Sequence, residues 1–218
     1  MKTIIYLIGP SFMIYIGLAI LKSVPYTFVL FYSWLFFIPL VTYLLNNEIK
    51  TLVQCLKGGL IFKSIYLGVT SGILSLIVIF ISVSFAQIHI FEIEQLKELL
   101  IKWQFSGSSV WGLIFVLLII NPFLEELYWR EFMHVKLLQQ YSGVKTIFIT
   151  SFFYSIYHLI PLLFMFELPY SLIGTIAVFS AGLLWGYFRL TFNSLVAPII
   201  SHALSDLGII LIYLYYFM

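Results

Sequence analysis

The sequence predicts an all-α protein: a bundle of about seven membrane-spanning helices, within a range of roughly six to eight, and one amphipathic helix along the membrane surface. Of its 218 residues, 62% are hydrophobic and 9% are charged, whereas a soluble domain carries about 25% charged residues. Mean hydropathy is +1.09. The apolar residues form runs close to the roughly 20 residues that cross a bilayer as a helix. Aromatic residues make up 19% of the chain, as expected where Tyr and Trp lie at membrane interfaces.

Turns and short polar stretches divide the apolar residues into the predicted spans. The spans are residues 4–21, 26–45, 64–88, one that begins near Val110 and carries the acidic cluster towards its far end, 146–166, 170–188 and 195–217. The polar, basic stretch 48–59 is interpreted as a short surface helix or loop. Gly68 and Gly72 are four residues apart in the third span, a spacing of small residues that lets two helices approach closely.

The amphipathic helix is expected between residues 89 and 109. Its apolar residues recur at three- and four-residue steps and face a side rich in Glu and Lys. They are Ile90, Ile93, Leu96, Leu100 and Trp103. Such a helix lies in the plane of the membrane interface, and Gly107 with its neighbouring serines is expected to end it.

Positive charges predict the orientation, because cytoplasmic loops are enriched in Lys and Arg. With the N-terminus inside, eight cations fall on the inner side: Lys2, Lys50, Lys57, Lys63, Arg130, Lys136, Lys145 and Arg189. Three fall outside: Lys22, Lys97 and Lys102. We therefore expect a multi-pass protein of the cell membrane, with a cytoplasmic N-terminus.

The composition also limits the binding partners. Cys55 is the only cysteine, which excludes an internal disulfide and a cysteine-based zinc site. The net charge of +2 gives no indication of nucleic-acid binding, so we expect none. Oligomeric state stays open, because the small-residue faces of the third and sixth spans can pack within the monomer or against a second copy.

Ionisable residues are few within the spans, and all lie in the last half of the chain. They are Glu125, Glu126, Arg130, His158, His202 and Asp206. A charge at the centre of a spanning helix costs roughly 2.5–3.5 kcal/mol, so such residues turn away from lipid and are functional-site candidates.

Helical spacing suggests how these groups pair. Glu126 and Arg130 are four residues apart and share a helix face, as do His202 and Asp206. Glu125 points to a different side, free to face the centre of the bundle. A carboxylate that water barely reaches suits a general base near neutral pH, and a histidine can donate a hydrogen bond to an oxyanion. Together these groups outline water-mediated hydrolysis inside a membrane.

The motifs are Glu125-Glu126-Leu-Tyr-Trp-Arg130, Tyr154-Ser-Ile-Tyr-His158 and His202-Ala-Leu-Ser-Asp206. In order and spacing this set resembles the CPBP family of intramembrane endopeptidases. That family comprises CAAX-processing prenyl endopeptidases and bacteriocin-processing or bacteriocin-immunity membrane proteins, often labelled Abi. The resemblance covers roughly residues 108–210. It implies one membrane domain, residues 1–218, with residues 1–107 as N-terminal spans and interfacial helix and residues 108–218 as the catalytic core.

The resemblance also implies roles. Glu125 and His158 would activate the water, and His202 with Asp206 would stabilise the oxyanion. Glu126 and Arg130 would brace the site. The substrate would be a hydrophobic or lipid-anchored peptide, reached laterally in the membrane or from the cytosolic side. This chain departs from the family pattern in two places: Tyr154 stands where Phe is usual, and Asp206 where Asn is frequent. Since an ionised acid cannot donate a hydrogen bond, orienting His202 suits Asp206 better than binding the oxyanion.

Other interpretations remain open at this point. Glu126 with Arg130 is also consistent with a purely structural ion pair, while Glu131 and His134 are expected at the solvated inner surface. We expect no cofactor; zinc, if present, would be bound by Glu125, His158 and His202. The rival functions are a non-catalytic immunity or scaffold protein of the same fold and, less favoured, a proton-coupled transporter. Transporters usually carry internal repeats, and the sequence shows none.

Overall fold

The computed structural model describes residues 2–46, 62–89 and 92–218, and these are helical with short connections and no strand. The first two helices are α1 (Lys2–Tyr15), extended by a π-helical segment (Ile16–Ile20), and α2 (Val24–Leu45). After them come α4 (Phe62–His89) and α5 (Ile93–Lys102). The expected surface helix or loop at 48–59 lies outside the described residues.

A single long helix follows α5, and its winding changes along its length. It consists of α6 (Val110–Phe115), a π segment (Val116–Ile120), α7 (Asn121–Glu126), a second π segment (Leu127–Met133) and α8 (His134–Leu138). The chain ends with α9 (Gly143–Met165), α10 (Tyr170–Phe192) and α11 (Val196–Tyr216). Seven of the described helices are long and apolar enough to cross a membrane, which confirms the predicted fold class.

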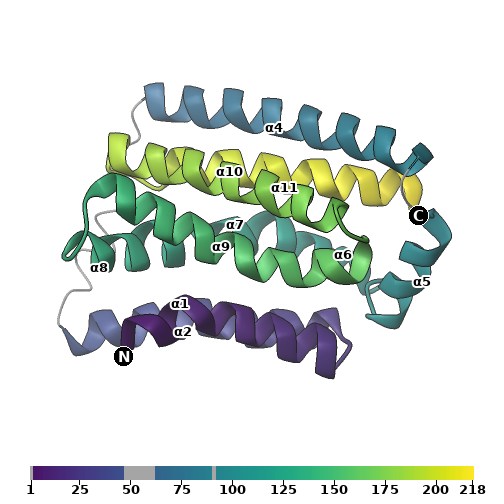
Figure 1. Ribbon diagram of the computed structural model, residues 1–218, viewed down its shortest axis with the longest axis horizontal. Helices are drawn as coiled ribbons and strands as arrows, with labels where there is room; N and C mark the ends of the chain where they lie inside the picture. Colours follow the sequence, from purple (N-terminus) through teal and green to yellow (C-terminus); the bar gives the residue numbers. More distant parts are fainter. Residues whose placement is uncertain (1, 47–61, 90–91) are drawn as a thin grey trace.

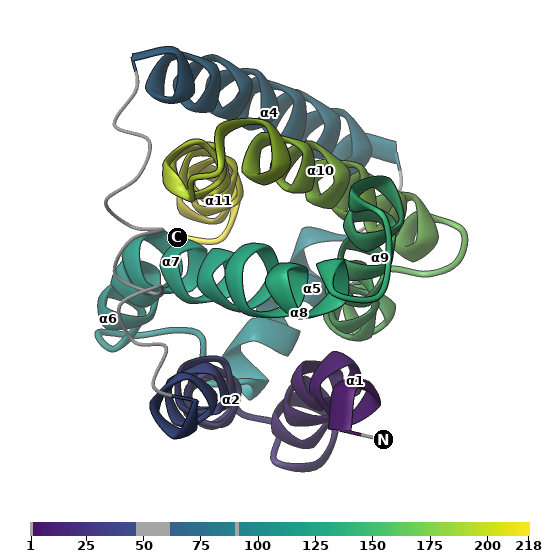
Figure 2. The ribbon, with the colours of Figure 1, turned by 90° about the vertical axis from the view of Figure 1, so that its left-hand side faces the viewer.

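The fourth span, Val110–Leu138, runs through the middle of the bundle. Figures 1 and 2 show α1 and α2 on one side of it and α10 and α11 on the other, with α4 outside α11. Because helices surround the fourth span, residues 124–134 are all buried. This burial protects its charged residues from lipid.

Proline explains the first change of winding in this span. Pro122 has no N–H to donate to the carbonyl of Leu118, and its ring crowds that carbonyl. The helix widens to π geometry just before it, at Val116–Ile120. π segments are rare and occur frequently at functional sites. Glu125 and Glu126 end α7, and Arg130 lies in the second π segment.

Small residues set the distance between α4 and α11. A Cβ on Gly68 would lie 3.0 Å from Cα of Ala197, and one on Gly72 would lie 3.0 Å from Cα of Ser201. The predicted close approach therefore occurs within the monomer, between the third and the last spans. It allows the Ser71 hydroxyl to donate to Oγ of Ser201, 3.1 Å away.

The amphipathic helix is present but shorter than expected, because α5 ends at Lys102. The chain leaves helical geometry at Gln104, whose φ is +62°. Trp103 and Leu96 are buried, and the carbonyl of Trp103 accepts a hydrogen bond from the N–H of Val24. The apolar side of α5 therefore packs on the bundle at the turn between α1 and α2. Its position at a membrane interface stays a prediction.

Candidate functional site

Glu126 is the centre of the buried polar cluster. Its Oε1 lies 2.9 Å from Nδ1 of His202, and its Oε2 lies 3.2 Å from Nε of Arg130. The predicted ion pair with Arg130 is present, but the contact with His202, from the last span, was not anticipated. A carboxylate only accepts hydrogen bonds, so Nδ1 of His202 donates. Glu126 thereby fixes both the orientation of the ring and the position of one ring proton.

Arg130 is held by partners on two further helices. Its Nη2 donates to the carbonyl oxygen of Gly182 at 3.3 Å, and its guanidinium lies 4.5 Å from the ring centroid of Tyr154. A Cβ on Gly182 would stand 3.3 Å from Nη2 of Arg130. The small residue on α10 therefore makes room for the arginine, and a cation over an aromatic ring is favourable.

Glu125 lies on the opposite side of the His202 ring from Glu126. Its Oε2 is 3.8 Å from Nε2 of His202, and its side chain is 3% exposed. No hydrogen bond of good geometry reaches this oxygen or the hydroxyl of Tyr157 among the described residues, although the two side chains lie close enough to interact. Buried polar atoms nearly always have partners, so an exception calls for an explanation. A carboxylate here is available to a small polar molecule.

Asp206 reaches the same nitrogen of His202 from α11. Its Oδ2 lies 3.5 Å from Nε2 of His202, and its side chain is 15% exposed. The amide of Asn121 donates to this oxygen at 3.0 Å. Asn121 in turn accepts a hydrogen bond from the hydroxyl of Tyr32 at 3.0 Å. Neither Asn121 nor Tyr32 has a role predicted from the sequence.

Trp185 packs against the ring of His202. Its indole ring stacks on the imidazole with 4.2 Å between centroids and 15° between planes. Its Nε1 donates to Oγ of Ser201 at 3.0 Å, the hydroxyl that Ser71 of α4 also contacts. No sequence signal separated Trp185 from the other aromatic residues of the spans.

His158 lies beside this cluster, on α9. Its Nδ1 is 2.9 Å from the carbonyl oxygen of Tyr154, and its ring is 4.4 Å from that of Tyr157. Within the described part of the chain, no hydrogen bond or ion pair joins it to Glu125, Glu126 or His202. A carbonyl can only accept, so Nδ1 donates and Nε2 of the neutral ring is an acceptor. Its expected role in water activation stays a prediction.

Two expectations about the inner surface were wrong. Glu131 is 1% exposed and pairs with Nη2 of Arg189 at 2.6 Å. His134 is 1% exposed rather than solvated. Glu131 lies in the second π segment and His134 begins α8. The fourth span has neighbouring helices on several sides here, so no face of it reaches solvent at this level. The Glu131–Arg189 pair joins the fourth span to α10 and closes this end of the bundle.

Metal ligation receives no geometric support. No group of three or more His, Cys, Asp or Glu among the described residues is arranged to hold a metal ion. The proposed zinc set of Glu125, His158 and His202 is therefore not assembled as a ligand set.

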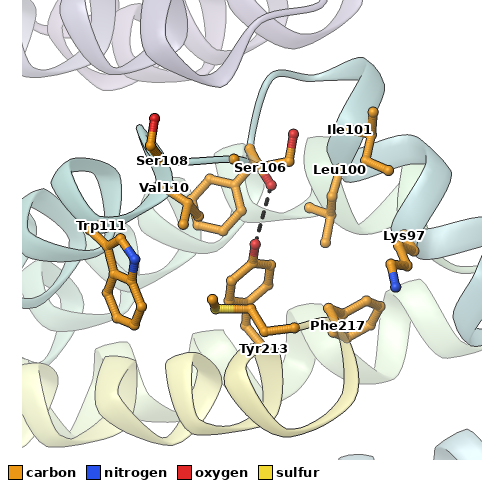
Figure 3. Close-up of a pocket in the computed structure, with 12 residues that line it drawn as sticks. Lys97, Leu100, Ile101, Ser106, Ser108, Val110, Trp111, Tyr213 and Phe217 are labelled. Carbon is orange, nitrogen blue, oxygen red and sulfur yellow. Dashed lines mark hydrogen bonds between the residues drawn. The ribbon is translucent and has the colours of Figure 1, made fainter.

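A cavity lies apart from the polar cluster. It has a volume of about 420 Å³ and is lined by residues of α5, the loop after it, α6 and the end of α11. Figure 3 shows Lys97, Trp111 and Tyr213 around it, and the dashed line is the bond from Tyr213 Oη to the carbonyl of Phe105. No residue of the polar cluster lines this cavity, so we do not assign the hydrolytic site to it.

The segment that carries the buried polar cluster matches a known protein family. Residues 107–208 match the family described as type II CAAX prenyl endopeptidase Rce1-like. Searches of curated proteins and of solved structures each found no match. The matched segment runs from the start of the fourth span into α11 and contains all six ionisable residues singled out in the spans. Residues 107–208, just under half of the chain, thus resemble the Rce1-like family of type II CAAX prenyl endopeptidases, a family of proteases.

Proposed function

We propose that this protein hydrolyses a peptide bond in a hydrophobic or lipid-anchored substrate, using a water molecule activated by Glu125 with His158. The observation that carries this proposal is the buried Oε2 of Glu125, which has no hydrogen-bond partner among the described residues and lies 3.8 Å from Nε2 of His202. The resemblance to this family supports the reaction class.

The proposed reaction needs only groups of this chain, water and the peptide. The water oxygen attacks the carbonyl carbon while Glu125 takes one water proton. The carbonyl oxygen becomes an oxyanion, which accepts a hydrogen bond from Nε2 of His202. Because Nδ1 of His202 donates to Glu126, this role requires the ring to carry both protons. Glu125 then returns its proton to the departing amine nitrogen, and the products are a carboxylic acid and an amine.

The other residues have supporting roles in this proposal. Glu126 and Arg130 hold His202 by its Nδ1, and Trp185 fixes the plane of the ring. Asp206 accepts a hydrogen bond from the amide of Asn121, which holds its carboxylate beside Nε2 of His202. From this position Asp206 orients the ring. His158 presents Nε2 as an acceptor for the attacking water, since its Nδ1 is used by the carbonyl of Tyr154.

Cleavage of a peptide library by the purified full chain in proteoliposomes tests this function. The library contains membrane peptides with and without a prenylated C-terminal cysteine. We expect wild-type protein to release defined products in the presence of a strong chelator at the same rate as without it. Loss of cleavage with the chelator and recovery with added zinc would replace the metal-free reaction with a metal-dependent one. If no peptide were cleaved, the non-catalytic scaffold would be the better description.

We also propose that the site lies in the cytoplasmic half of the cell membrane, because the basic loops fall on the side expected to be inside. Single cysteines in a Cys55→Ser background test this orientation. Ser142→Cys should react with a membrane-impermeant thiol reagent only from the cytoplasmic side, and Ser108→Cys only from outside. The reverse labelling pattern would contradict the proposal.

A further inference from the structure

A chain of hydrogen bonds connects three helices at the edge of the polar cluster. The hydroxyl of Tyr32, on α2, donates to Oδ1 of Asn121, on α7, at 3.0 Å. Nδ2 of Asn121 donates to Oδ2 of Asp206, on α11, also at 3.0 Å. The same Oδ2 lies 3.5 Å from Nε2 of His202. The chain of contacts therefore ends at the ring nitrogen that faces Glu125.

The direction of each bond follows from the groups involved. A carboxamide has an oxygen that accepts and a nitrogen that donates, and a carboxylate only accepts. Because the carboxylate of Asp206 only accepts, it requires the nitrogen of Asn121 to face it, which leaves the amide oxygen to accept from the hydroxyl of Tyr32. That second bond stabilises the same orientation of the amide and ties it to α2. Tyr32 thus supports the position of Asn121 that Asp206 requires.

Two carboxylates lie at similar distances from His202, and the hydrogen bond from Asn121 to one of them distinguishes their surroundings. Oε2 of Glu125 and Oδ2 of Asp206 lie 3.8 Å and 3.5 Å from the same nitrogen of His202. Only Asp206 is additionally anchored by an amide, whereas Oε2 of Glu125 has no hydrogen-bond partner among the described residues. The anchored carboxylate is suited to hold the ring, and the unanchored one to take a proton from water.

We propose that Asn121 and Tyr32 are positioning residues of the hydrolytic site, holding Asp206 against His202 and leaving Glu125 free to act on water. This inference rests on the proposed function. Tyr32 lies on α2, outside residues 107–208 that match the family. The N-terminal half of the chain therefore contributes to the site, although it carries none of the three motifs.

Removing each group should lower kcat and leave KM unchanged. Tyr32→Phe keeps the ring and deletes one hydroxyl, so we expect a kcat about threefold to tenfold lower, the effect of one hydrogen bond. Asn121→Ala deletes the amide and frees Asp206, and we expect a kcat lower by up to about a hundredfold, as for a misplaced catalytic group. Steady-state rates in proteoliposomes, per folded molecule, give both constants.

An exchange of the two groups distinguishes positioning from packing. Asn121→Asp alone brings two carboxylates into contact and should lower kcat by about a hundredfold. Combined with Asp206→Asn, it restores one amide facing one carboxylate, and Tyr32 can still donate to the group at position 121. We expect the double variant to recover at least about tenfold in kcat over Asn121→Asp, because the interaction between the two sites is regained.

The matched controls are Tyr26→Phe, on the exposed side of α2, and Asn46→Ala, at the exposed end of α2. Both should retain the wild-type kcat. Thermal unfolding in detergent is measured for every variant, and Tyr32→Phe should unfold close to the wild-type temperature.

The outcomes separate this inference from the proposed function. If Tyr32→Phe and Asn121→Ala retain the wild-type kcat while Glu125→Gln is inactive, the positioning role is wrong and the protease function stands. A loss of rate that only follows the loss of folded protein, with no rescue by the double variant, would also overturn the role. If the wild-type chain cleaves no peptide, both proposals fail.

Discussion

Glu125→Gln is expected to reduce peptide cleavage by about 10²- to 10⁴-fold, the contribution of a general base. Glutamine has nearly the same shape as glutamate, but it cannot take a proton from water. Oε2 of Glu125 has no hydrogen-bond partner among the described residues, and its contact with Nε2 of His202 is long, at 3.8 Å, so the substitution removes little stabilisation. The variant should therefore fold like wild type while losing its activity. Initial rates and thermal unfolding of the same preparation measure the two effects separately.

The control for this prediction is Glu98→Gln, on the exposed side of α5. It makes the same chemical change far from His202 and should cleave at the wild-type rate. A wild-type rate for Glu125→Gln would show that another group activates the water. His158, whose Nε2 is free to accept because its Nδ1 donates to the carbonyl of Tyr154, would then be the group to examine first.

Arg130→Met is expected to lower the free energy of unfolding by about 3–5 kcal/mol, the cost of removing one partner from a buried ion pair. Arg130 is fully buried, and it contacts Glu126, the carbonyl of Gly182 and the ring of Tyr154. Without it, the charge of Glu126 remains buried with His202 as its only ionic partner in the part of the chain that the structure describes. For a chain of this size, each 1 kcal/mol shifts Tm by about 2–4 °C, so a loss of roughly 6–20 °C is expected.

A double variant and a surface control test whether Arg130 stabilises the fold through its ion pair with Glu126. Arg130→Met with Glu126→Leu removes both charges, so it should be less destabilised than the sum of the two single variants. Lys102→Met removes an exposed cation at the end of α5 and should change stability by less than about 0.5 kcal/mol. If Arg130→Met unfolded at the wild-type temperature, the bracing role of Arg130 would be contradicted.

Glu126 differs from Arg130 because it also contacts His202. Its bond to Nδ1 of His202 ties the ion pair to the proposed chemistry, so Glu126→Gln should affect both stability and rate. Rates per folded molecule separate these effects: a variant with normal activity per folded molecule would be consistent with bracing alone.

The sequence by itself determined the fold class and indicated most residues of the buried polar cluster. Long apolar runs must be helices in a bilayer, because the backbone groups can be satisfied there only within a helix or a closed barrel. The high cost of charge in lipid singled out Glu125, Glu126 and Arg130, and their spacing placed Glu126 and Arg130 on one face. The glycine spacing in the third span indicated close packing with another helix.

Only the tertiary structure decided which groups meet between helices. Helical periodicity describes one helix at a time, so it could not show that Nδ1 of His202 contacts Glu126, or that Trp185 stacks on the ring. Glu131 was assigned to the surface because its sequence neighbourhood ends a span, whereas α10 supplies Arg189 to neutralise it.

Tyr32 and Asn121 show the same limit most clearly. The chain has 15 tyrosines, and nothing in the sequence separates Tyr32 from the others of the spans. Asn121 was only weakly indicated as a functional residue, because it is an amide at the end of an apolar run. Its partners come from α2 and α11, which are distant in the sequence. A hydrogen bond depends on the distance and direction between two atoms, and between helices these are fixed only when the bundle packs.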